Sequence, residues 1–177
     1  MSERVPGESR GRYHPLLGTN VDVRVTAEAA SRDEAVALAS RAEDAAVAEM
    51  VRLQAIFSIH EPGSELSRWR RGDPVEASDE LAEVLAAAER WWRLSGGAFH
   101  PAVGSLFERW GRAEREGVEP PAAELDALVA GLAELPFRAD GDAIVRVGDC
   151  SGVNLYAIAK GFIVDRAVAV ALAAAGV

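Results

Sequence analysis

The sequence predicts an α+β protein in which helices pack on a mixed or antiparallel sheet. Residues 21–25 alternate apolar and polar side chains, as a half-buried strand does, and residues 137–147 carry two short strand-like runs around an Asp-Gly turn. Alanine-rich amphipathic segments occupy most of the remaining chain. Because the expected strands are too few to cover so many helices, we expect the domain to continue beyond Val177.

The first elements follow from local signals. Residues 1–15 contain charges and glycines, and we expect them to form a flexible lead to a domain over residues 16–177. After the strand at 21–25, Ser31 and Glu34 form a capping box that begins a helix ending near Phe57. A Pro-Gly break then separates it from a short helix over 64–71.

The second half of the chain is predicted to be mostly helical. Ser78 caps a helix that Gly96 and Gly97 end. Its buried face is predicted to carry Leu81, Val84, Leu85 and Ala88. Two further helices, over 103–110 and 120–132, precede the hairpin, and a last helix runs from Asn154 to Ala175. The predicted apolar face of that last helix consists of Ile163, Ala167, Val170 and Leu172.

Composition and charge exclude several classes of function. The formal net charge is -9, which disfavours binding to nucleic acid or to an anionic membrane, because both recruit basic surfaces. The single cysteine, Cys150, allows no intrachain disulfide and no metal cluster by itself. The first residues lack the apolar core of a secretory signal, and no apolar run is long enough to span a bilayer. We therefore expect a cytoplasmic protein that does not insert into membranes.

The start of the last predicted helix is a candidate anion site. Asn154 is a favoured N-cap residue, and the free amides of the first turn can bind a phosphate group. Lys160 lies near this positive end of the helix, where an anionic ligand would stabilise its charge. The same residues also fit an ordinary capped core helix with a lysine extended to solvent.

Three other segments could contact a flat ligand. Residues 95–106, SGGAFHPAVGSL, combine two glycines with Phe99, although a glycine cap before a proline-started helix has the same pattern. Residues 57–69, FSIHEPGSELSRW, contain His60, which could equally be a solvated or core imidazole. Residues 16–19, LLGT, precede the first predicted strand.

These four segments, in this order, resemble the motifs of ApbE-like flavin transferases over nearly the whole chain. The last one keeps AIAKG at 157–161 and the Val-Asp at 164–165, with Asn154 in place of an aspartate and Phe162 in place of a tyrosine. In the family's SGGAFDP motif, His100 replaces the aspartate. His60 replaces a tyrosine, and Leu17 replaces a methionine of comparable volume.

The resemblance implies an FAD:protein FMN transferase that moves FMN from FAD to a threonine hydroxyl of an acceptor flavoprotein, releases AMP and depends on Mg²⁺. It implies FAD contacts for seven residues, Leu17, His60, Ala98, Phe99, His100, Asn154 and Lys160. It also implies a Mg²⁺ contact for the carbonyl of Ala157, and it assigns no catalytic residue. The family's metal-binding aspartate and threonine are expected beyond Val177, so we do not expect the isolated 177-residue chain to be active.

Two other functions remain open from the sequence. The substitutions at His60, His100 and Asn154 favour a degenerate module that binds FAD without transferring FMN. A truncated fragment with no activity of its own is the third possibility.

Overall fold

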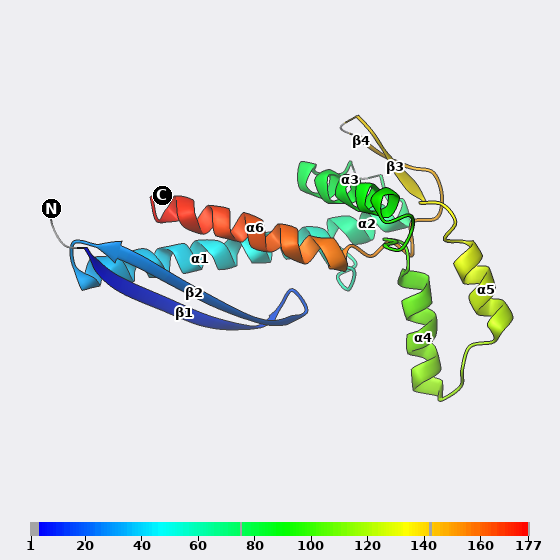
Figure 1. Ribbon diagram of the computed structural model, residues 1–177, viewed down its shortest axis with the longest axis horizontal. Helices are drawn as coiled ribbons and strands as arrows, with labels where there is room; N and C mark the ends of the chain where they lie inside the picture. The colour runs from blue at the N-terminus through cyan, green and yellow to red at the C-terminus, as the bar shows by residue number, and fades with distance from the viewer. Residues whose placement is uncertain (1–3, 75, 142, 177) are drawn as a thin grey trace. The chain divides into compact units, whose positions relative to one another are not determined.

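The computed structural model describes residues 4–74, 76–141 and 143–176. Within these ranges it has six helices and two antiparallel sheets of two strands each, in the order β1, β2, α1–α5, β3, β4, α6 (Figure 1). The predicted α+β class is therefore confirmed. The chain divides into two compact units, which are described separately: one combines residues up to 56 with residues from 160 onwards, and the other spans residues 57–159.

The first unit begins with a long hairpin. Strand β1, Val5–Leu16, pairs antiparallel with β2, Thr19–Ala29, and Val5 lies opposite Ala29. The prediction of a flexible lead over residues 1–15 is therefore wrong from Val5 onwards, whereas residues 1–3 lie outside the described part of the chain. The prediction failed because the glycines, proline and charges of β1 hide its strand character, which comes from pairing with β2.

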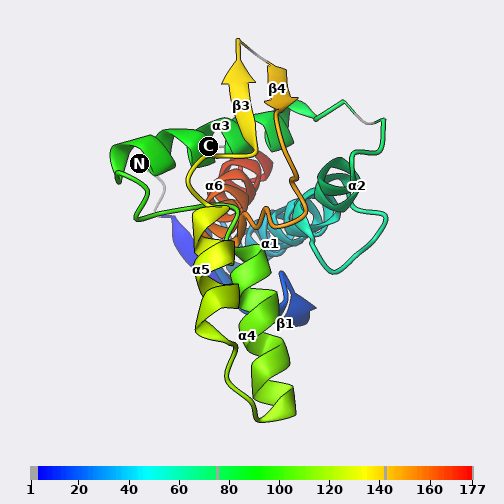
Figure 2. The same cartoon turned by 90° about the vertical axis from the view of Figure 1, so that its right-hand side faces the viewer.

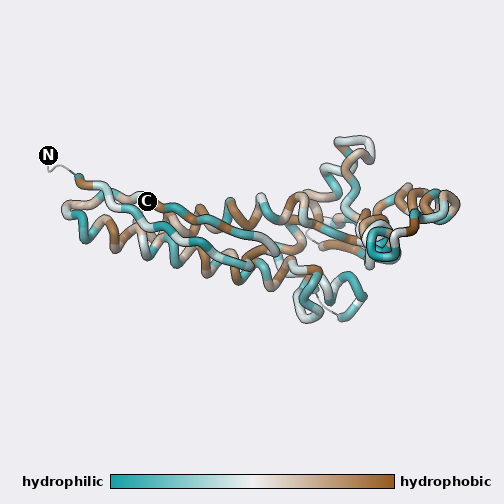
Figure 3. Tube along the Cα trace, turned by 90° about the horizontal axis from the view of Figure 1, so that it is seen from below, coloured by the Kyte–Doolittle hydropathy of each residue, from teal (hydrophilic) through white to brown (hydrophobic). Residues whose placement is uncertain are grey.

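Two helices accompany this hairpin in the first unit. Helix α1 is Arg32–Phe57, and the Ser31 Oγ accepts a hydrogen bond of 3.3 Å from the Glu34 amide, as the predicted cap requires. Half of its buried positions are alanines, all in the first part of the helix, so the strand backbone can approach closely: a Cβ on Gly7 would lie 2.5 Å from the Val36 nitrogen. Figure 3 shows apolar and polar residues alternating along the turns of α1.

Helix α6, Tyr156–Ala174, only partly matches its predicted apolar face. Ile163 and Ala167 are buried as predicted, whereas Val170 and Leu172 are exposed. Leu172 lines an apolar groove of about 870 Å³, together with residues of β2 and α1. The sequence pattern identified an apolar face, but part of that face has no cover among the described residues.

The second unit contains the remaining elements. Its helices are α2, Glu65–Arg71; α3, Asp79–Leu94; α4, Gly104–Glu116; and α5, Ala122–Ala130. Strands β3, Phe137–Asp140, and β4, Ala143–Arg146, form the predicted hairpin, in which Asp142 lies outside the described residues. Figure 2 shows this hairpin beside α3, and α4 beside α5. Helix α4 extends six residues beyond its predicted end at Trp110.

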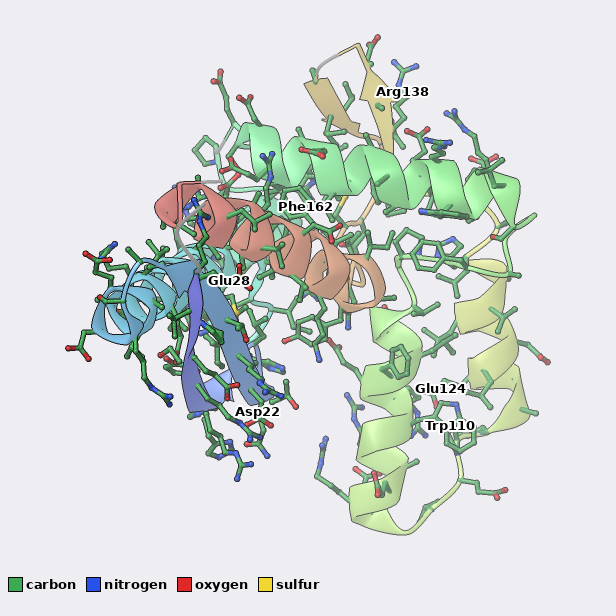
Figure 4. All side chains as sticks on the ribbon, turned by 60° about the vertical axis from the view of Figure 1, so that its left-hand side comes forward. Asp22, Glu28, Trp110, Glu124, Arg138 and Phe162 are labelled. Atoms are coloured by element: carbon green, nitrogen blue, oxygen red, sulfur yellow. The ribbon has the colours of Figure 1, made fainter. Side chains whose placement is uncertain are left out.

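The core of the second unit forms between α3, α2 and β3. The Ser78 side chain caps α3, and all four residues of its predicted face are buried. Trp69 of α2 packs edge-on against Phe137 of β3, with ring centroids 5.8 Å apart. A separate ion pair of 2.8 Å between Arg109 and Glu124 joins α4 to α5, and Figure 4 shows Glu124 between these two helices.

The helices of the described ranges do not meet the requirements for a membrane span. None of them is both long enough and apolar enough to cross a bilayer.

Candidate functional site

Two loops that the sequence analysis singled out meet at the start of α4 and α6. The Asn154 amide donates to the Pro101 carbonyl at 2.7 Å, and the Gly104 amide donates to the Gly152 carbonyl at 2.8 Å. A Cβ on Gly104 would lie only 2.5 Å from the Gly152 oxygen, so this approach requires glycine at position 104. These contacts hold the motif around Phe99 against the motif that begins α6.

Asn154 organises the first turn of α6. Its Oδ1 accepts a hydrogen bond of 3.0 Å from the Tyr156 amide, so Asn154 caps the helix although the regular helix begins two residues later than predicted. The Ala157 amide makes no hydrogen bond among the described residues, as is usual in a first helical turn. The helix therefore presents one N–H group for an anionic ligand.

A pocket of about 540 Å³ lies at this helix start, and we call it the Phe99 pocket. Its lining residues are Ala98, Phe99, His100, Val103, Phe107, Asn154, Tyr156 and Ala157. Five of these were predicted as site residues from the sequence. Phe99 is half-buried, and its amide donates to the Ser95 Oγ at 2.9 Å, which fixes the backbone on which the ring is carried.

His100 forms the buried side of the Phe99 pocket and is only 9% exposed. Its Nδ1 accepts a hydrogen bond of 3.1 Å from the Ala102 amide, and its ring lies edge-on to Trp92. Burial lowers the pKa of His100, and a backbone hydrogen bond with Leu132 opposes this effect without cancelling it. His100 is therefore neutral at pH 7 and, because Nδ1 accepts, carries its proton on Nε2. The ring therefore supplies no positive charge to the pocket.

His60 is exposed on the loop between α1 and α2, which a group of serines holds in place. The Ser58 carbonyl accepts hydrogen bonds from the hydroxyls of Ser64 and Ser67, and the Ser58 Oγ accepts the His60 amide at 3.3 Å. The His60 ring centroid is 6.0 Å from that of Tyr156. Tyr156 was not predicted as a site residue, although an aromatic residue two positions after a capping asparagine was a usable signal.

A second pocket, of about 500 Å³, adjoins the first, and we call it the arginine pocket. One face of α4 contributes Gly104, Phe107, Glu108, Gly111, Arg112 and Arg115, and the other lining residues are Ile59, His60, Arg70 and Asn154. Phe107 and Asn154 line both pockets. The three arginines were missed from the sequence, although the spacing along α4 of three and four residues would have placed two of them on one face.

Two predicted residues belong to the first unit and are described within it. Leu17 lies in the turn between β1 and β2 with a φ of 53°, and its amide donates to the Gln54 Oε1 at 2.6 Å. Lys160 is an exposed residue of α6. The structure thus brings six of the eight predicted residues to the two pockets. The FAD contacts of all seven predicted residues, and the Mg²⁺ contact of Ala157, stay predictions.

The pockets do not supply a complete Mg²⁺ site. Mg²⁺ requires about six oxygen ligands in near-octahedral geometry. The Phe99 pocket is lined by no carboxylate, and the described ranges contain no group of three or more His, Cys, Asp or Glu side chains that could hold a metal ion. The Ala157 carbonyl is one neutral oxygen and does not hold Mg²⁺ alone. No chemical step is therefore assigned to a metal held by these residues.

The fold and the two adjoining pockets define an α+β protein with a nucleotide-sized site at the start of a helix. Comparison with known proteins identifies the class. The model of the ApbE family matches residues 17–177. The chain therefore belongs to the ApbE family.

Individual relatives agree with this assignment. An FAD:protein FMN transferase of Chlamydia pneumoniae is 28% identical over 119 residues, which are 64% of this chain and 38% of that protein. One of Haemophilus influenzae is 30% identical over 125 residues, 64% of this chain and 36% of that protein.

Solved structures show the same fold. The ApbE protein of Thermotoga maritima has a TM-score of 0.74 and 25% identity, covering 94% of this chain and 53% of its own. The flavin transferase ApbE of Vibrio cholerae has a TM-score of 0.70 and 24% identity, also covering 94% of this chain and 53% of its own. The chain thus spans about half the length of these solved relatives.

Proposed function

We propose that this chain is the flavin-nucleotide-binding part of an FAD:protein FMN transferase. The observation that carries the proposal is the Phe99 pocket, where hydrogen bonds between Asn154 and Pro101 and between Gly104 and Gly152 bring two family motifs together. The names of the curated relatives support the same activity.

The residues of the Phe99 pocket suit a ligand that is flat at one end and anionic at the other. The Phe99 ring can pack against an isoalloxazine or adenine ring. The Ala157 amide at the start of α6 can donate to a phosphate oxygen. The neutral His100 lines the pocket without adding charge to the site. The contribution of this chain is therefore binding and orientation of FAD.

In the proposed reaction, the hydroxyl oxygen of an acceptor threonine attacks the FMN phosphorus. The bond between that phosphorus and the oxygen bridging to AMP breaks, AMP leaves, and the hydroxyl proton is lost. Phosphoryl transfer of this kind depends mainly on positioning and on neutralisation of charge. When bound, Mg²⁺ would supply that neutralisation, and the described residues contain no group of three or more His, Cys, Asp or Glu side chains to hold it.

The second candidate is a module that binds FAD without transferring FMN. The observation in its favour is that the Phe99 pocket, as described, contains no carboxylate that could bind a metal or accept a proton.

One experiment separates the two candidates. The natural gene product, at its native length, is incubated with FAD, Mg²⁺ and a threonine-containing acceptor peptide. We expect AMP and flavin-labelled peptide in equal amounts, measured by chromatography and by flavin fluorescence of the peptide. FAD binding with no AMP would instead establish the binding module, and failure to bind FAD would contradict both.

The same assay on the isolated 177-residue chain has a different expected result. We expect it to bind FAD and to release no AMP at any Mg²⁺ concentration, because its pockets lack the ligands for Mg²⁺. Mg²⁺-dependent transfer by the isolated chain would show that its own residues build a metal site that we have not identified.

A further inference from the structure

The arginine pocket concentrates positive charge on a protein whose net charge is -9. Three arginines and one carboxylate, Glu108, line it. None of the three arginines belongs to the motifs that define the family resemblance. A local excess of positive charge in a concave surface attracts and holds anions, whatever the net charge of the molecule.

Arg70 is the most strongly constrained of these arginines. One terminal nitrogen donates to the Ser151 carbonyl, while the Nε is buried without a hydrogen bond. No ion pair joins Arg70 to a carboxylate within residues 4–74, 76–141 and 143–176. Burial lowers the pKa of Arg70, and the charges of Glu108 and Asp149 oppose that effect. Burying a guanidinium costs free energy, and Arg70 has no paired carboxylate in the described part of the chain to offset that cost. A bound anion would stabilise its charge.

Arg112 and Arg115 extend the charge along α4. They follow Glu108 and Gly111 at helical spacing on the face that lines the pocket. The surface at Gly111 is open, because a Cβ placed there would meet no atom beyond its chain neighbours and its own helix backbone closer than a guanidinium nitrogen of Arg115 at 3.8 Å. By contrast, Arg109 of the same helix is already paired with Glu124 of α5. The two pocket arginines have no such carboxylate partner among the described residues.

We propose that Arg70, Arg112 and Arg115 bind a phosphate group of a nucleotide. Guanidinium groups match the geometry of phosphate oxygens and bind them by paired hydrogen bonds. The apolar side chains of Ile59 and Phe107 line the same pocket and can contact a base or ring. The choice of a nucleotide rests on the proposed function, because Phe107 and Asn154 make this pocket continuous with the Phe99 pocket.

The test measures affinity for AMP, inorganic phosphate and riboflavin by calorimetry on the 177-residue chain. The main variant is Arg112→Gln/Arg115→Gln, because both side chains are exposed and their loss leaves the core intact. The control is Arg41→Gln/Arg90→Gln, which removes the same charge from exposed positions outside both pockets. Arg70→Gln and Glu108→Gln complete the set.

We expect the main variant to weaken AMP binding by about tenfold or more, with the control unchanged, because charge-assisted hydrogen bonds are lost. Glu108→Gln should tighten AMP binding, since it removes the one repelling carboxylate of the pocket. Riboflavin, which has no phosphate, should bind equally to all variants. If these residues had only a structural role, Glu108→Gln would not raise AMP affinity while the arginine substitutions lower it.

Several results would overturn the proposal. Equal AMP affinity in the main variant and the control rejects the assignment, as does an absence of AMP binding to the unmodified chain. Inorganic phosphate binding as tightly as AMP rejects a nucleotide site. If the substitutions of the main variant, made in the natural gene product, abolish peptide labelling but leave AMP affinity unchanged, the arginines bind the acceptor protein instead of a nucleotide.

The outcome for the arginine pocket can be separated from the outcome for the proposed function. If FAD binds equally well to the chain and to the main variant, the pocket proposal fails and the transferase proposal stands. If FAD does not bind but AMP binding depends on Arg112 and Arg115, the pocket proposal stands and the transferase proposal fails.

Discussion

Glu43 is a buried carboxylate beneath the β1–β2 hairpin, and it controls the protonation of a neighbouring tyrosine. Glu43 is 5% exposed and accepts hydrogen bonds from the hydroxyls of Ser9 and Tyr13, the latter at 2.6 Å. A Cβ on Gly11 would collide with the carboxylate, so glycine leaves room for this side chain in its observed position. The hydrogen bond to Glu43 raises the pKa of Tyr13 to about 12.

This raised pKa predicts alkaline destabilisation of the first unit. The folded pKa of Tyr13 lies above its ordinary value of 10.0, so the stabilisation is fully present below pH 10 and is lost as the pH rises towards about 12. The chain has two tyrosines, so Tyr156→Phe leaves Tyr13 as the only one. We expect its phenolate absorbance to titrate near pH 12, and a midpoint near pH 10 in the folded protein would contradict the hydrogen bond to Glu43.

At the scale of elements, the close approach of α4 and the loop before α6 determines the shape of the site. Gly104 is the first residue of α4, and its amide donates to the carbonyl of Gly152, which belongs to the loop. A side chain on Gly152 would also be too close, because its Cβ would lie 2.8 Å from the Ser105 Oγ and 2.9 Å from the Ala102 carbonyl oxygen. The two segments can therefore meet only where both of them lack a side chain.

Gly104→Ala should separate these two segments. The added methyl group would lie 2.5 Å from the Gly152 oxygen, and we expect a loss of about 1–3 kcal/mol in the free energy of unfolding. Gly111→Ala, a change of the same kind in the same helix, meets no atom closer than 3.8 Å and should be neutral or stabilising by about 1 kcal/mol. Urea unfolding measures both, and equal effects of the two substitutions would show that the close approach is absent.

The sequence predicts elements well where the signal is local. Ser78 and the apolar spacing that follows it correctly define α3 and its buried face, because capping and helical period act within a few residues. Strand β1 was missed because its partner, β2, determines its structure. Arg70 was missed because its pocket forms only when α2 and α4 fold together, and no local pattern contains that information.

At the scale of the whole molecule, the two units carry different parts of the expected chemistry. The second unit holds both pockets and six of the eight predicted site residues. The first unit holds Leu17, Lys160 and the apolar groove lined by β2, α1 and α6. Since the chain spans about half the length of its solved relatives, the activity named for those relatives is proposed for it and is open to test.

The most direct test of the central claim is the affinity of the 177-residue chain for FAD, measured by calorimetry with Phe99→Ala and a control. Trp91→Ala is the control, because Trp91 is an aromatic residue that is 55% exposed and lines neither pocket. We expect FAD to bind, Phe99→Ala to weaken binding by about tenfold through loss of ring contact, and Trp91→Ala to have no effect. Failure of the chain to bind FAD, or equal affinities in the two variants, would contradict the assignment of the flavin-nucleotide site to the Phe99 pocket.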